Sequence, residues 1–481
     1  MTVRGASPLP WIIAFLEGFS TLAVEVIAIR LAIPVVGSSM TLTGVMLGVV
    51  LFALSAGYWR GGELSAQWDR TKIRTALTRN LLLAAVLYGA VAFPLEATLI
   101  EKLLDAGITL SWAIGIAASL LFIPPIYLAS QTIPMVAELT NYEGKAGKAS
   151  GKVLFFSTIG SVAGGIVTPV WLFPSIGVAH STFVVCGLLS AAAVVMAIGH
   201  FRALKAIGGA VAAMILVLSV SATTARNNDL FHFDSAYQNI RVVEETDDGP
   251  PLRVMMVSGG RASGIYSESG ETAFPYTRLA AKLVEDTKAG NVLVIGAAGF
   301  TLPRDAALLP LVQHVDAVDI DPAVKGIAES QFLRHALPGN VRFIPLSARY
   351  AMRKLRNEGR HYDFTFIDAF FGRGIPDELA TVEFFEDVRR ISGRTAANAI
   401  LDRTLESEFA RNLLVTFRHV FGQVWVRAVK PGESETANIM LTSWPAPESV
   451  EWNGPGHAYR DDSNTADRDH VRLIWGGGER P

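Results

Sequence analysis

The sequence has a single cysteine, few charged residues and almost no excess of charge of either sign. Cys186 lies inside an apolar run, which excludes a disulfide within the chain and a metal site built from cysteines. The net charge of −2 supplies no general basic field, and no Lys/Arg cluster compensates for it locally. We therefore expect no nucleic acid among the partners of this protein.

Apolar residues, in contrast, make up half of the chain, and only 18% of the residues are charged. This apolar share exceeds that of ordinary soluble domains, so we expect a membrane portion. Residues 1–224 form a series of long apolar runs, whereas residues 225–481 alternate charged helical stretches with short β-type runs. The pattern predicts a multi-pass α-helical membrane domain over 1–224 and a soluble domain over 225–481.

Runs of roughly 20 apolar residues are long enough to cross a bilayer as helices. The first domain contains seven such runs, at about 9–33, 40–60, 80–100, 108–130, 152–174, 178–199 and 204–223. Small residues recur inside them, as at 160–165, and allow helix backbones to approach closely. The helices of a soluble bundle would carry polar stripes, which most of these runs lack.

The first apolar run carries three ionisable residues, Glu17, Glu25 and Arg30. Such groups are unstable in hydrocarbon unless they are paired or face an aqueous cavity, so we expect them to point into the helix bundle. Glu25 and Arg30 are five positions apart, a little beyond the spacing at which helix neighbours meet, so an ion pair with another helix is at least as plausible as one within this helix. A structural ion pair and a polar pathway or ligand site both stay open.

The second domain contains a regular series of strands and helices. Residues 291–295 form a short apolar strand that runs into the glycine turn 296–299, and a helix follows from Pro303 to about Leu311. We also expect strands at 315–319, 341–346 and 362–368, a hairpin-like pair at 237–243 and 252–257, and a helix at 272–287. Alternating strands and helices predict a parallel sheet that binds ligands at the carboxyl ends of its strands.

Acidic residues close two of these strands. Asp319 follows Gly296 by 23 positions, the spacing at which a carboxylate reaches the ribose of a nucleotide held on the glycine turn. Asp321 precedes a proline, which is typical of a helix start, whereas Asp368 ends an apolar strand where a sheet presents ligand groups. The glycines alone would fit any tight turn, and they lack the full G-x-G-x-x-G spacing of dinucleotide dehydrogenases.

Four segments resemble, in order, motifs of the spermidine synthase (polyamine aminopropyltransferase) family: residues 234–240 (DSAYQNI), 296–299 (GAAG), 318–322 (VDIDP) and 368–376 (DAFFGRGIP). The resemblance covers about residues 234–445. It implies an α/β, Rossmann-like class I S-adenosylmethionine (SAM) transferase domain preceded by a small β hairpin region. The helical half is similar to the multi-pass portion fused to such domains in bacteria, through Gly18, Glu25, Arg30 and the turn at 37–39. A multi-pass protein of the bacterial inner membrane is therefore implied.

The resemblance also implies roles for individual residues. Gln238 and the Gly296 turn would contact the methylthioadenosine part of the ligand, Asp319 would hold its ribose, and Asp368 would lie beside the transferred three-carbon chain. The catalytic candidates are Asp368, Tyr237 and Tyr276, and no metal is implied. The candidates for binding SAM or decarboxylated SAM are Gln238, Ser258, Gly296, Ala297, Gly299, Asp319, Ile320, Ser347, Ala348, Asp368 and Phe370.

This chain departs from the family pattern at several of these positions. Gly299 stands where the family has an acid in its glycine turn, Phe371 where it has a second active-site acid, and Ser347 where it has an acid that faces adenine. Residues 257–259 (VSG) replace Leu-Asp-Gly, and Tyr276-Thr277 replaces Tyr-His. A polyamine acceptor needs several carboxylates to bind its ammonium groups and to remove a proton, and this site keeps about one. Phe370 and Phe371 would instead form an aromatic wall for adenine or the sulfonium, or pack in the core.

The leading hypothesis is an enzyme that binds SAM or its decarboxylated form and breaks the bond between the sulfonium and the three-carbon chain, releasing 5′-methylthioadenosine. The chain would pass to an amine or close on itself as a lactone. The alternatives are a SAM-dependent methyltransferase that acts on a lipid or membrane-embedded acceptor, and a transporter or sensor that binds the nucleotide without turnover. The expected partners are a small-molecule substrate and the lipid bilayer, and a homodimer stays open.

The side of the membrane on which the soluble domain lies is predicted in two opposite ways. Lys and Arg gather in the connections near 60–79, 143–152 and 200–205, which we expect to be cytoplasmic. With seven spans, this charge pattern places the soluble domain outside the cytoplasm. SAM is made in the cytoplasm, so either one run, such as 80–100 with Pro94 and Glu96, is not a full crossing, or the soluble domain faces outward and the ligand must reach it.

Overall fold

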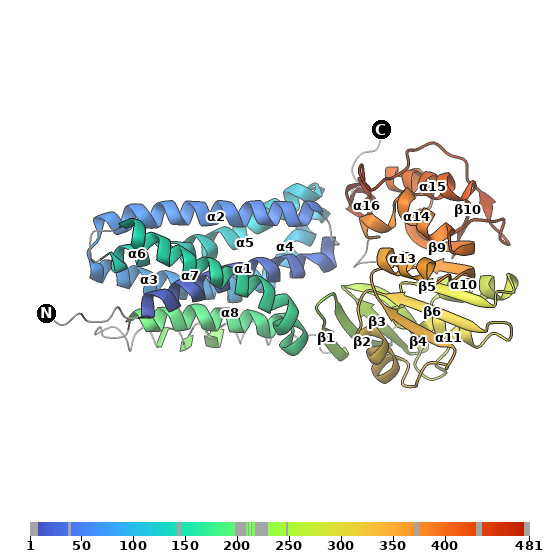
Figure 1. Ribbon diagram of the computed structural model, residues 1–481, viewed down its shortest axis with the longest axis horizontal. Coiled ribbons are helices and arrows are strands. Elements are labelled where there is room, and N and C mark those ends of the chain that lie inside the picture. Colours follow the sequence, from blue (N-terminus) through green and yellow to red (C-terminus); the bar gives the residue numbers. More distant parts are fainter. Residues whose placement is uncertain are drawn as a thin grey trace. The chain divides into compact units, whose positions relative to one another are not determined.

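The computed structural model divides into two compact units (Figure 1). One contains residues 1–35 and 40–226, and the other contains residues 36–39 and 227–481. The structure describes residues 8–36, 40–141, 146–197, 208–209, 211–212, 214–216, 229–246, 249–369, 375–429 and 435–475. The expected fold class is confirmed, because a helical unit with long apolar helices is followed by an α/β unit.

The described part of the first unit is entirely helical. Its elements are α1 (Leu9–Val36), α2 (Met40–Gln67), α3 (Arg70–Val86), η1 (Leu87–Ala92), α4 (Phe93–Asp105), α5 (Leu110–Ser130), α6 (Thr132–Thr140), α7 (Ala146–Val167), η2 (Thr168–Leu172) and α8 (Phe173–Ala197). Among the described residues, five helical stretches are long and apolar enough to cross a membrane: Leu9–Val36, Met40–Gln67, Arg70–Asp105, Leu110–Thr140 and Ala146–Ala197.

The number of stretches is two lower than the seven expected, and the last stretch explains one of the two. As one straight helix, its 52 residues would be roughly 78 Å long, more than twice the hydrocarbon thickness of a bilayer. Gly177 interrupts the helix with non-helical angles (φ 78°, ψ 169°). The expected runs 152–174 and 178–199 therefore lie on either side of a break within one stretch. The seventh expected run, 204–223, falls mostly outside the described residues.

Small residues bring α1 and α7 into close contact, as expected from the glycine-rich segment 160–165. A Cβ atom on Gly160 would lie 2.1 Å from the carbonyl oxygen of Phe15, and one on Gly164 would lie 2.2 Å from that of Phe19. Such distances are far below van der Waals contact, so only glycine allows these backbones to pack. Close packing of this kind is how helices associate where no hydrophobic effect drives them together.

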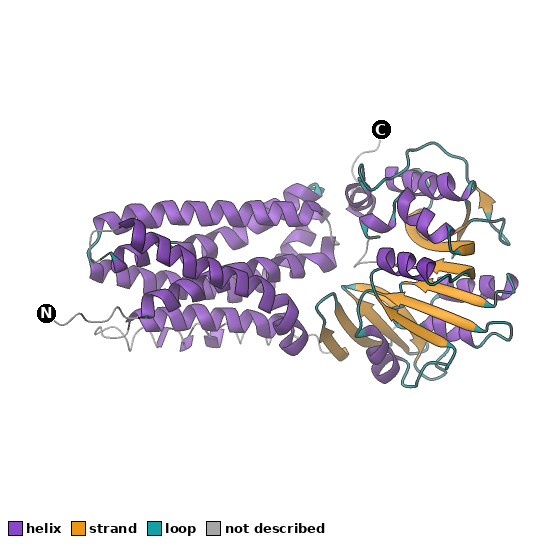
Figure 2. Cartoon of the chain, viewed as in Figure 1, coloured by secondary structure: helices purple, strands orange, loops and turns teal. Residues whose placement is uncertain are grey.

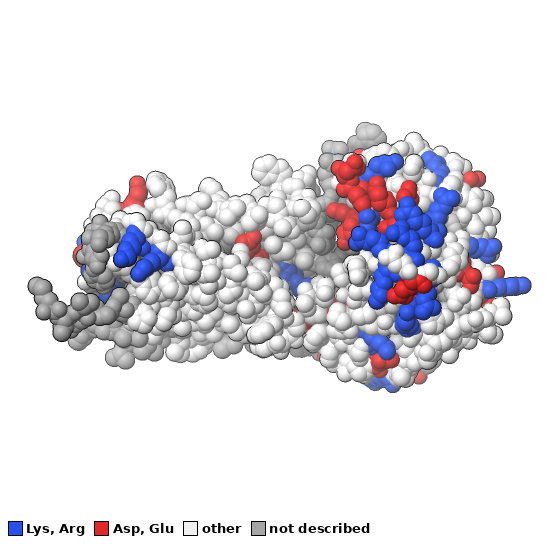
Figure 3. All heavy atoms as spheres, in the orientation of Figure 1, with Lys and Arg blue, Asp and Glu red and all other residues white. Residues whose placement is uncertain are grey.

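The outer surface of the helical unit is apolar. Large side chains such as Phe52, Trp112 and Trp171 are 63%, 69% and 70% exposed. In Figure 3 few charged atoms lie on the visible face of the helical unit, whereas many lie on the α/β unit. Apolar surface of this extent is unfavourable in water and is what lipid-facing helices present.

The second unit begins with a four-stranded antiparallel sheet in the order β1-β2-β3-β4. Its strands are β1 (Asp229–Asp234), β2 (Asn239–Glu245), β3 (Leu252–Val257) and β4 (Gly260–Tyr266). The expected hairpin is confirmed as the antiparallel pair of β2 and β3. Sequence patterns missed β1 and β4, which pair with its two outer sides and extend it to a sheet.

An eight-stranded sheet follows (Figure 2), in the order β12-β10-β11-β9-β8-β5-β6-β7. Its strands are β5 (Asn291–Ile295), β6 (His314–Asp319), β7 (Val341–Pro345), β8 (Tyr362–Ile367), β9 (Ser392–Asp402), β10 (Trp425–Ala428), β11 (Thr436–Thr442) and β12 (Val450–Glu451). The five strands from β9 to β7 in this order pair in parallel, as expected from the alternation of strands and helices. The last strands join antiparallel at the other edge.

Helices cover both faces of this sheet. They are α10 (Pro275–Asp286), α11 (Thr301–Ala307), α12 (Val324–Ile327), η3 (Ala328–Phe332), α13 (Ala348–Asn357), η4 (Asp377–Leu379), α14 (Val382–Arg389), α15 (Glu408–Phe421) and α16 (Ala466–Trp475). The central strand β5 shows the two layers. Val292 and Val294 pack with α10 and α11, whereas Leu293 and Ile295 pack with α13 to α15. Because both faces of β5 are buried, its sequence is a continuous apolar run.

Candidate functional site

The glycine turn begins where β5 ends, directly beside the end of β8. Gly296 has a φ of +91°, and a Cβ atom there would lie 2.2 Å from the carbonyl oxygen of Asp368. The backbone N–H of Gly296 donates to the carbonyl oxygen of Val318 (2.9 Å), and that of Asp368 donates to Ile295 (2.8 Å). Both the left-handed angle and the lack of space require glycine. The strand ends of β5, β6 and β8 are thereby held together at one edge of the sheet.

Asp319 closes β6 and organises this turn. Its Oδ2 accepts hydrogen bonds from the backbone N–H groups of Ala297 and Ala298 (both 3.2 Å), and its Oδ1 accepts one from Asp321 (3.0 Å). Burial raises the pKa of Asp319 to about 6, and the backbone donors oppose this rise. The side chain of the next residue, Ile320, is 41% exposed. The structure therefore brings the predicted acid and the predicted turn together.

Asp368 lies at the end of β8 in a polar cluster. Its Oδ1 accepts a hydrogen bond from Nδ2 of Asn398 on β9 (2.9 Å). The Tyr276 hydroxyl donates to the carbonyl oxygen of Ala262 (3.0 Å), and it lies near enough to Asp368 to lower the pKa of that carboxyl. Burial is the larger effect and raises the pKa of Asp368 to about 6, while burial and Asp368 together raise the pKa of Tyr276 well above its usual value. Two of the three predicted catalytic residues therefore lie together.

Asn398 is a site residue that sequence reasoning missed. It is 4% exposed, and its Oδ1 has no hydrogen-bond partner in the part of the chain that the structure describes. A buried acceptor without a donor is unfavourable, so it marks a place where a ligand donor fits. The sequence feature that could have identified Asn398 is an amide inside the apolar segment 396–401 (AANAIL), because a buried strand otherwise excludes polar groups.

The loop between β1 and β2 carries Tyr237 and Gln238. The backbone N–H groups of both residues donate to the Ser235 hydroxyl oxygen (3.0 and 2.9 Å), which also lies 2.5 Å from Oδ2 of Asp321. The side chain of Gln238 is 4% exposed, whereas Tyr237 is 43% exposed. The contact with Ser235, which the sequence did not reveal, therefore connects this loop to the end of β6.

Asp321 has two contacts, and one of them was expected. Its Oδ1 accepts from the backbone N–H of Ala323 (2.9 Å) at the start of the helical segment. This bond is the capping role predicted from the Asp-Pro pair. Because the other carboxylate oxygen lies against Ser235, Asp321 also positions the loop that carries Gln238.

Gly299 shows why this chain carries no acid in its turn. A Cβ atom there would lie 2.6 Å from both Cε1 of Phe332 and Cβ of Ser263. The Ser263 hydroxyl accepts a hydrogen bond from the Gly299 N–H (3.1 Å). Phe332 and Ser263 therefore fill the space that a side chain at 299 would need.

The remaining predicted site residues lie in other turns and helix ends of the second unit or outside the described residues. Ser258 is buried, has a φ of +46° and lies in the tight turn between β3 and β4, where its N–H donates to Asn239 (2.8 Å). Ser347 and Ala348 stand at the N-cap and the first residue of α13, beyond the end of β7. Phe370 and Phe371 lie outside the described residues. Within the described ranges, no group of three or more His, Cys, Asp or Glu residues is arranged to hold a metal ion.

A parallel sheet with a glycine turn after one strand and an acid at the end of the next defines the class of Rossmann-like, nucleotide-binding proteins. No family model matches the chain. It is 31% identical over 230 residues to a polyamine aminopropyltransferase of Vibrio vulnificus, a match that covers 45% of this chain and 73% of that relative. The chain belongs to the polyamine aminopropyltransferase family, which confirms the resemblance seen in its motifs.

Two further comparisons describe the extent of this likeness. The polyamine aminopropyltransferase 1 of Streptomyces coelicolor is 25% identical over 432 residues, which cover 81% of this chain and 74% of that relative. That match is longer than the second unit, so it includes part of the helical unit. A probable spermidine synthase from Corynebacterium glutamicum, known by its crystal structure, is 21% identical and covers 52% of this chain and 88% of its own, with a TM-score of 0.37.

Proposed function

We propose that this protein is an integral membrane enzyme that binds decarboxylated SAM and transfers its aminopropyl chain to an amine, releasing 5′-methylthioadenosine. The adenosine part lies over the Gly296 turn, with its ribose hydroxyls donating to Asp319 and its methylthio end toward Asp368. The observation that carries the proposal is the convergence of these groups at one edge of the sheet, in a chain of this family.

The chemistry requires a base and an aligned nucleophile. The amine nitrogen attacks the chain carbon that is bonded to the sulfonium. As the new C–N bond forms, the C–S bond breaks, and both of its electrons pass to sulfur, which leaves as a neutral thioether. The amine gives up one proton, and the Asp368 carboxylate takes it.

The environment of Asp368 fits this role. With a pKa of about 6, the carboxyl is mostly ionised at neutral pH, yet it is a stronger base than an ordinary aspartate. Asn398 holds one carboxylate oxygen, and its Oδ1, which has no partner among the described residues, accepts from the incoming neutral amine or from the amino group of the transferred chain. Alignment of the amine with the scissile bond supplies most of the rate, because the sulfonium is already a good leaving group.

A second candidate, closure of SAM's own three-carbon chain to a lactone, is supported by one observation. The acid of the family's glycine turn is absent, and Phe332 occupies the space beside Gly299. A site with fewer carboxylates binds a polycationic acceptor less strongly. Lactone formation uses the ligand's carboxylate as nucleophile and needs no base, so it tolerates this loss.

Product analysis tests the proposal and separates it from its rivals. The full-length protein in detergent is incubated with decarboxylated SAM plus a diamine, with decarboxylated SAM alone, and with SAM alone, and the adenosine product is identified. Methylthioadenosine that depends on the diamine supports aminopropyl transfer, whereas methylthioadenosine plus a lactone from SAM alone supports the second candidate. S-adenosylhomocysteine would show methyl transfer, and tight binding without any product would show a sensor; either result refutes the proposal.

A further inference from the structure

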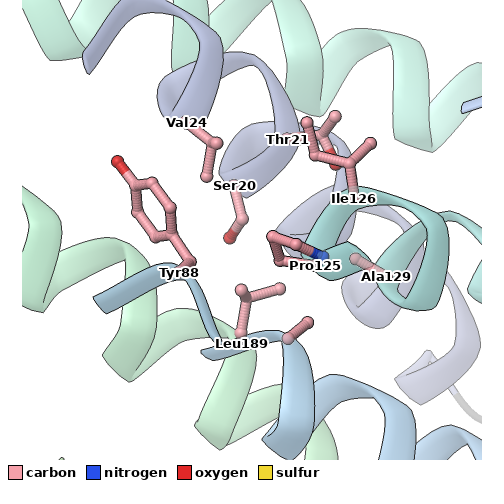
Figure 4. Close-up of a pocket in the computed structure, with 9 residues that line it drawn as sticks. Ser20, Thr21, Val24, Tyr88, Pro125, Ile126, Ala129 and Leu189 are labelled. Carbon is pink, nitrogen blue, oxygen red and sulfur yellow. The ribbon is translucent and has the colours of Figure 1, made fainter. Parts of the chain in front are cut away.

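The described part of the helical unit buries acids but offers little to a polar ligand. Glu17 is buried as expected, and its carboxylate accepts hydrogen bonds from Thr21 (3.3 Å) and Ser157 (3.1 Å). Glu96 is also buried, and neither of its oxygens has a partner among the described residues. A small internal cavity lies between α1, α3, η1, α5 and α8, but its walls are mainly apolar and the Tyr88 hydroxyl points away from it (Figure 4). A polar molecule in this cavity would find too few hydrogen-bond partners.

The second unit, in contrast, holds its predicted nucleoside contacts through a buried serine. Ser235 begins the turn between β1 and β2, and it is 4% exposed, as is Gln238. The Ser235 hydroxyl oxygen accepts hydrogen bonds from the backbone N–H groups of Tyr237 (3.0 Å) and Gln238 (2.9 Å). The backbone N–H of Ser235 donates in turn to the carbonyl oxygen of Gln238 (2.9 Å). This serine therefore fixes the backbone of the turn that carries Gln238.

The Ser235 hydroxyl has one proton, and two acceptors lie within its reach. The carbonyl oxygen of Gln238 is 3.0 Å away, and Oδ2 of Asp321 is 2.5 Å away. The hydrogen bond to the carboxylate is the stronger of the two, because its acceptor carries a charge. The carbonyl oxygen of Gln238 already accepts from the Ser235 N–H, so the hydroxyl proton goes to Asp321. The hydroxyl is thereby fixed as an acceptor toward the turn and a donor toward Asp321.

Asp321 connects this turn with the acid at the end of β6. It is 1% exposed and lies 86 positions from Ser235 in the sequence. Its backbone N–H donates to Oδ1 of Asp319 (3.0 Å), and its own Oδ1 accepts from the backbone N–H of Ala323 (2.9 Å). Asp321 therefore contacts the predicted ribose acid through its backbone and the Gln238 turn through its side chain.

The side chain at position 321 needs two acceptor oxygens. One accepts from Ala323 at the start of the helical segment, and the other accepts from Ser235. An amide has a single acceptor oxygen, and its NH₂ group would face either a backbone N–H or a hydroxyl that already accepts two hydrogen bonds. A buried polar group without a partner is unfavourable. Asparagine at this position would therefore release either the helix start or the turn.

We propose that Ser235 and Asp321 form a positioning pair that presents Gln238 and Asp319 to the adenosine part of the substrate. The role of the pair rests on the proposed function, because it assumes that adenosine binds at the glycine turn between these residues. The hydrogen bonds of the pair reach the turn and Asp319 rather than the cluster around Asp368. The pair therefore acts on substrate binding and not on bond breaking.

The kinetic test uses the full-length protein in detergent and the variants Asp321→Asn, Ser235→Ala and their double variant. We expect each single variant to raise KM for decarboxylated SAM and the Kd of methylthioadenosine ~10-fold or more, with kcat changed less than about threefold. Ser407→Ala is the matched control, because Ser407 likewise donates to an aspartate, Asp402, and accepts from a backbone N–H, that of Ala410 (3.1 Å), but caps α15. It should keep the wild-type KM and Kd even where its Tm falls.

The double variant shows whether the two residues act as one unit. A pair predicts that the double variant binds about as well as the weaker single variant, whereas independent residues would give effects that multiply. Multiplied effects, an unchanged KM in both single variants, or a fall in kcat at constant KM overturns the proposal.

Amide hydrogen exchange without substrate tests the pair independently of the reaction. Exchange in residues 235–240 should be faster in both single variants than in the wild type, because the N–H groups of Tyr237 and Gln238 lose their fixed acceptor. Unchanged exchange overturns the pair. A wild type that binds no adenosyl compound would refute the proposed function, and with it the role of the pair in binding. Wild-type affinity in both single variants would refute the pair alone.

Discussion

Replacing Asp368 by asparagine should remove activity and stabilise the protein at the same time. The substitution keeps the shape of the side chain and an oxygen that can accept from Asn398, but it removes the base. General bases typically contribute 10²–10⁴-fold to a rate, so we expect a loss of at least ~100-fold in kcat/KM. In the wild type, kcat/KM should fall as pH drops below about 6, because protonation removes the carboxylate.

The gain in stability follows from the same pKa. Burial raises the pKa of Asp368 from 3.8 to about 6, so the ionised carboxyl destabilises the folded protein by about 2–3 kcal/mol. The folded state binds more protons than the unfolded state between about pH 4 and 6, so the free energy of unfolding falls as pH rises through this window. The penalty is complete above pH 6 and absent below pH 4. Asp368→Asn should therefore be more stable than the wild type at pH 8, and the two should converge at pH 4.

The assay combines methylthioadenosine release from pH 5 to 9 with chemical unfolding of the full-length protein in detergent at pH 4 and 8. Asp363→Asn is the matched control, because Asp363 lies near the amino end of the same strand and accepts from the backbone N–H groups of Gly290 and Asn291 (2.9 and 2.8 Å). It should keep near-wild-type activity. If Asp368→Asn lost activity together with stability at pH 8, or if the wild-type profile showed no bend near pH 6, the reasoning would be refuted.

Three further substitutions test other parts of the structure. Asp319→Ala should weaken methylthioadenosine binding, measured by calorimetry, at least ~10-fold, because it removes charge-assisted hydrogen bonds to the ribose and to the glycine turn. An unchanged affinity would contradict the role of Asp319. Gly299→Asp should lower Tm by several degrees, because the new side chain would collide with Phe332. Adding Phe332→Ala should recover part of the lost stability. A Gly299→Asp variant as stable as the wild type would show that the turn has room for an acid. Gly160→Val should destabilise the helical unit in detergent. The nearby Gly151→Val should not, because a Cβ atom at Gly151 meets no other atom within 4 Å. Equal effects of the two substitutions would argue against close packing of α1 and α7.

Local sequence patterns predicted the central strands accurately. The apolar runs that became β5, β6 and β8 are short and mostly buried, and the glycine or acid at the end of each one marks where the strand stops. The ends of parallel strands meet at one edge, so the positions of Gly296, Asp319 and Asp368 in the sequence already predicted that they would lie together. The expected hairpin, in contrast, is part of a four-stranded sheet, and local patterns missed β1 and β4 because these strands are only partly apolar.

The composition of the chain alone determined that it has a helical, lipid-compatible half and an α/β half, and its motifs indicated the family. Only the tertiary structure decided which polar groups are satisfied. Asn398, Ser235 and Ser263 come from strands and loops distant in sequence from the groups they contact, and their hydrogen bonds depend on how the sheet and its neighbours pack. The same holds for Glu96. A carboxyl or hydroxyl in an apolar run has the same sequence signature whether a neighbouring helix supplies a partner or not, and burial without a partner exists only once the helices have packed.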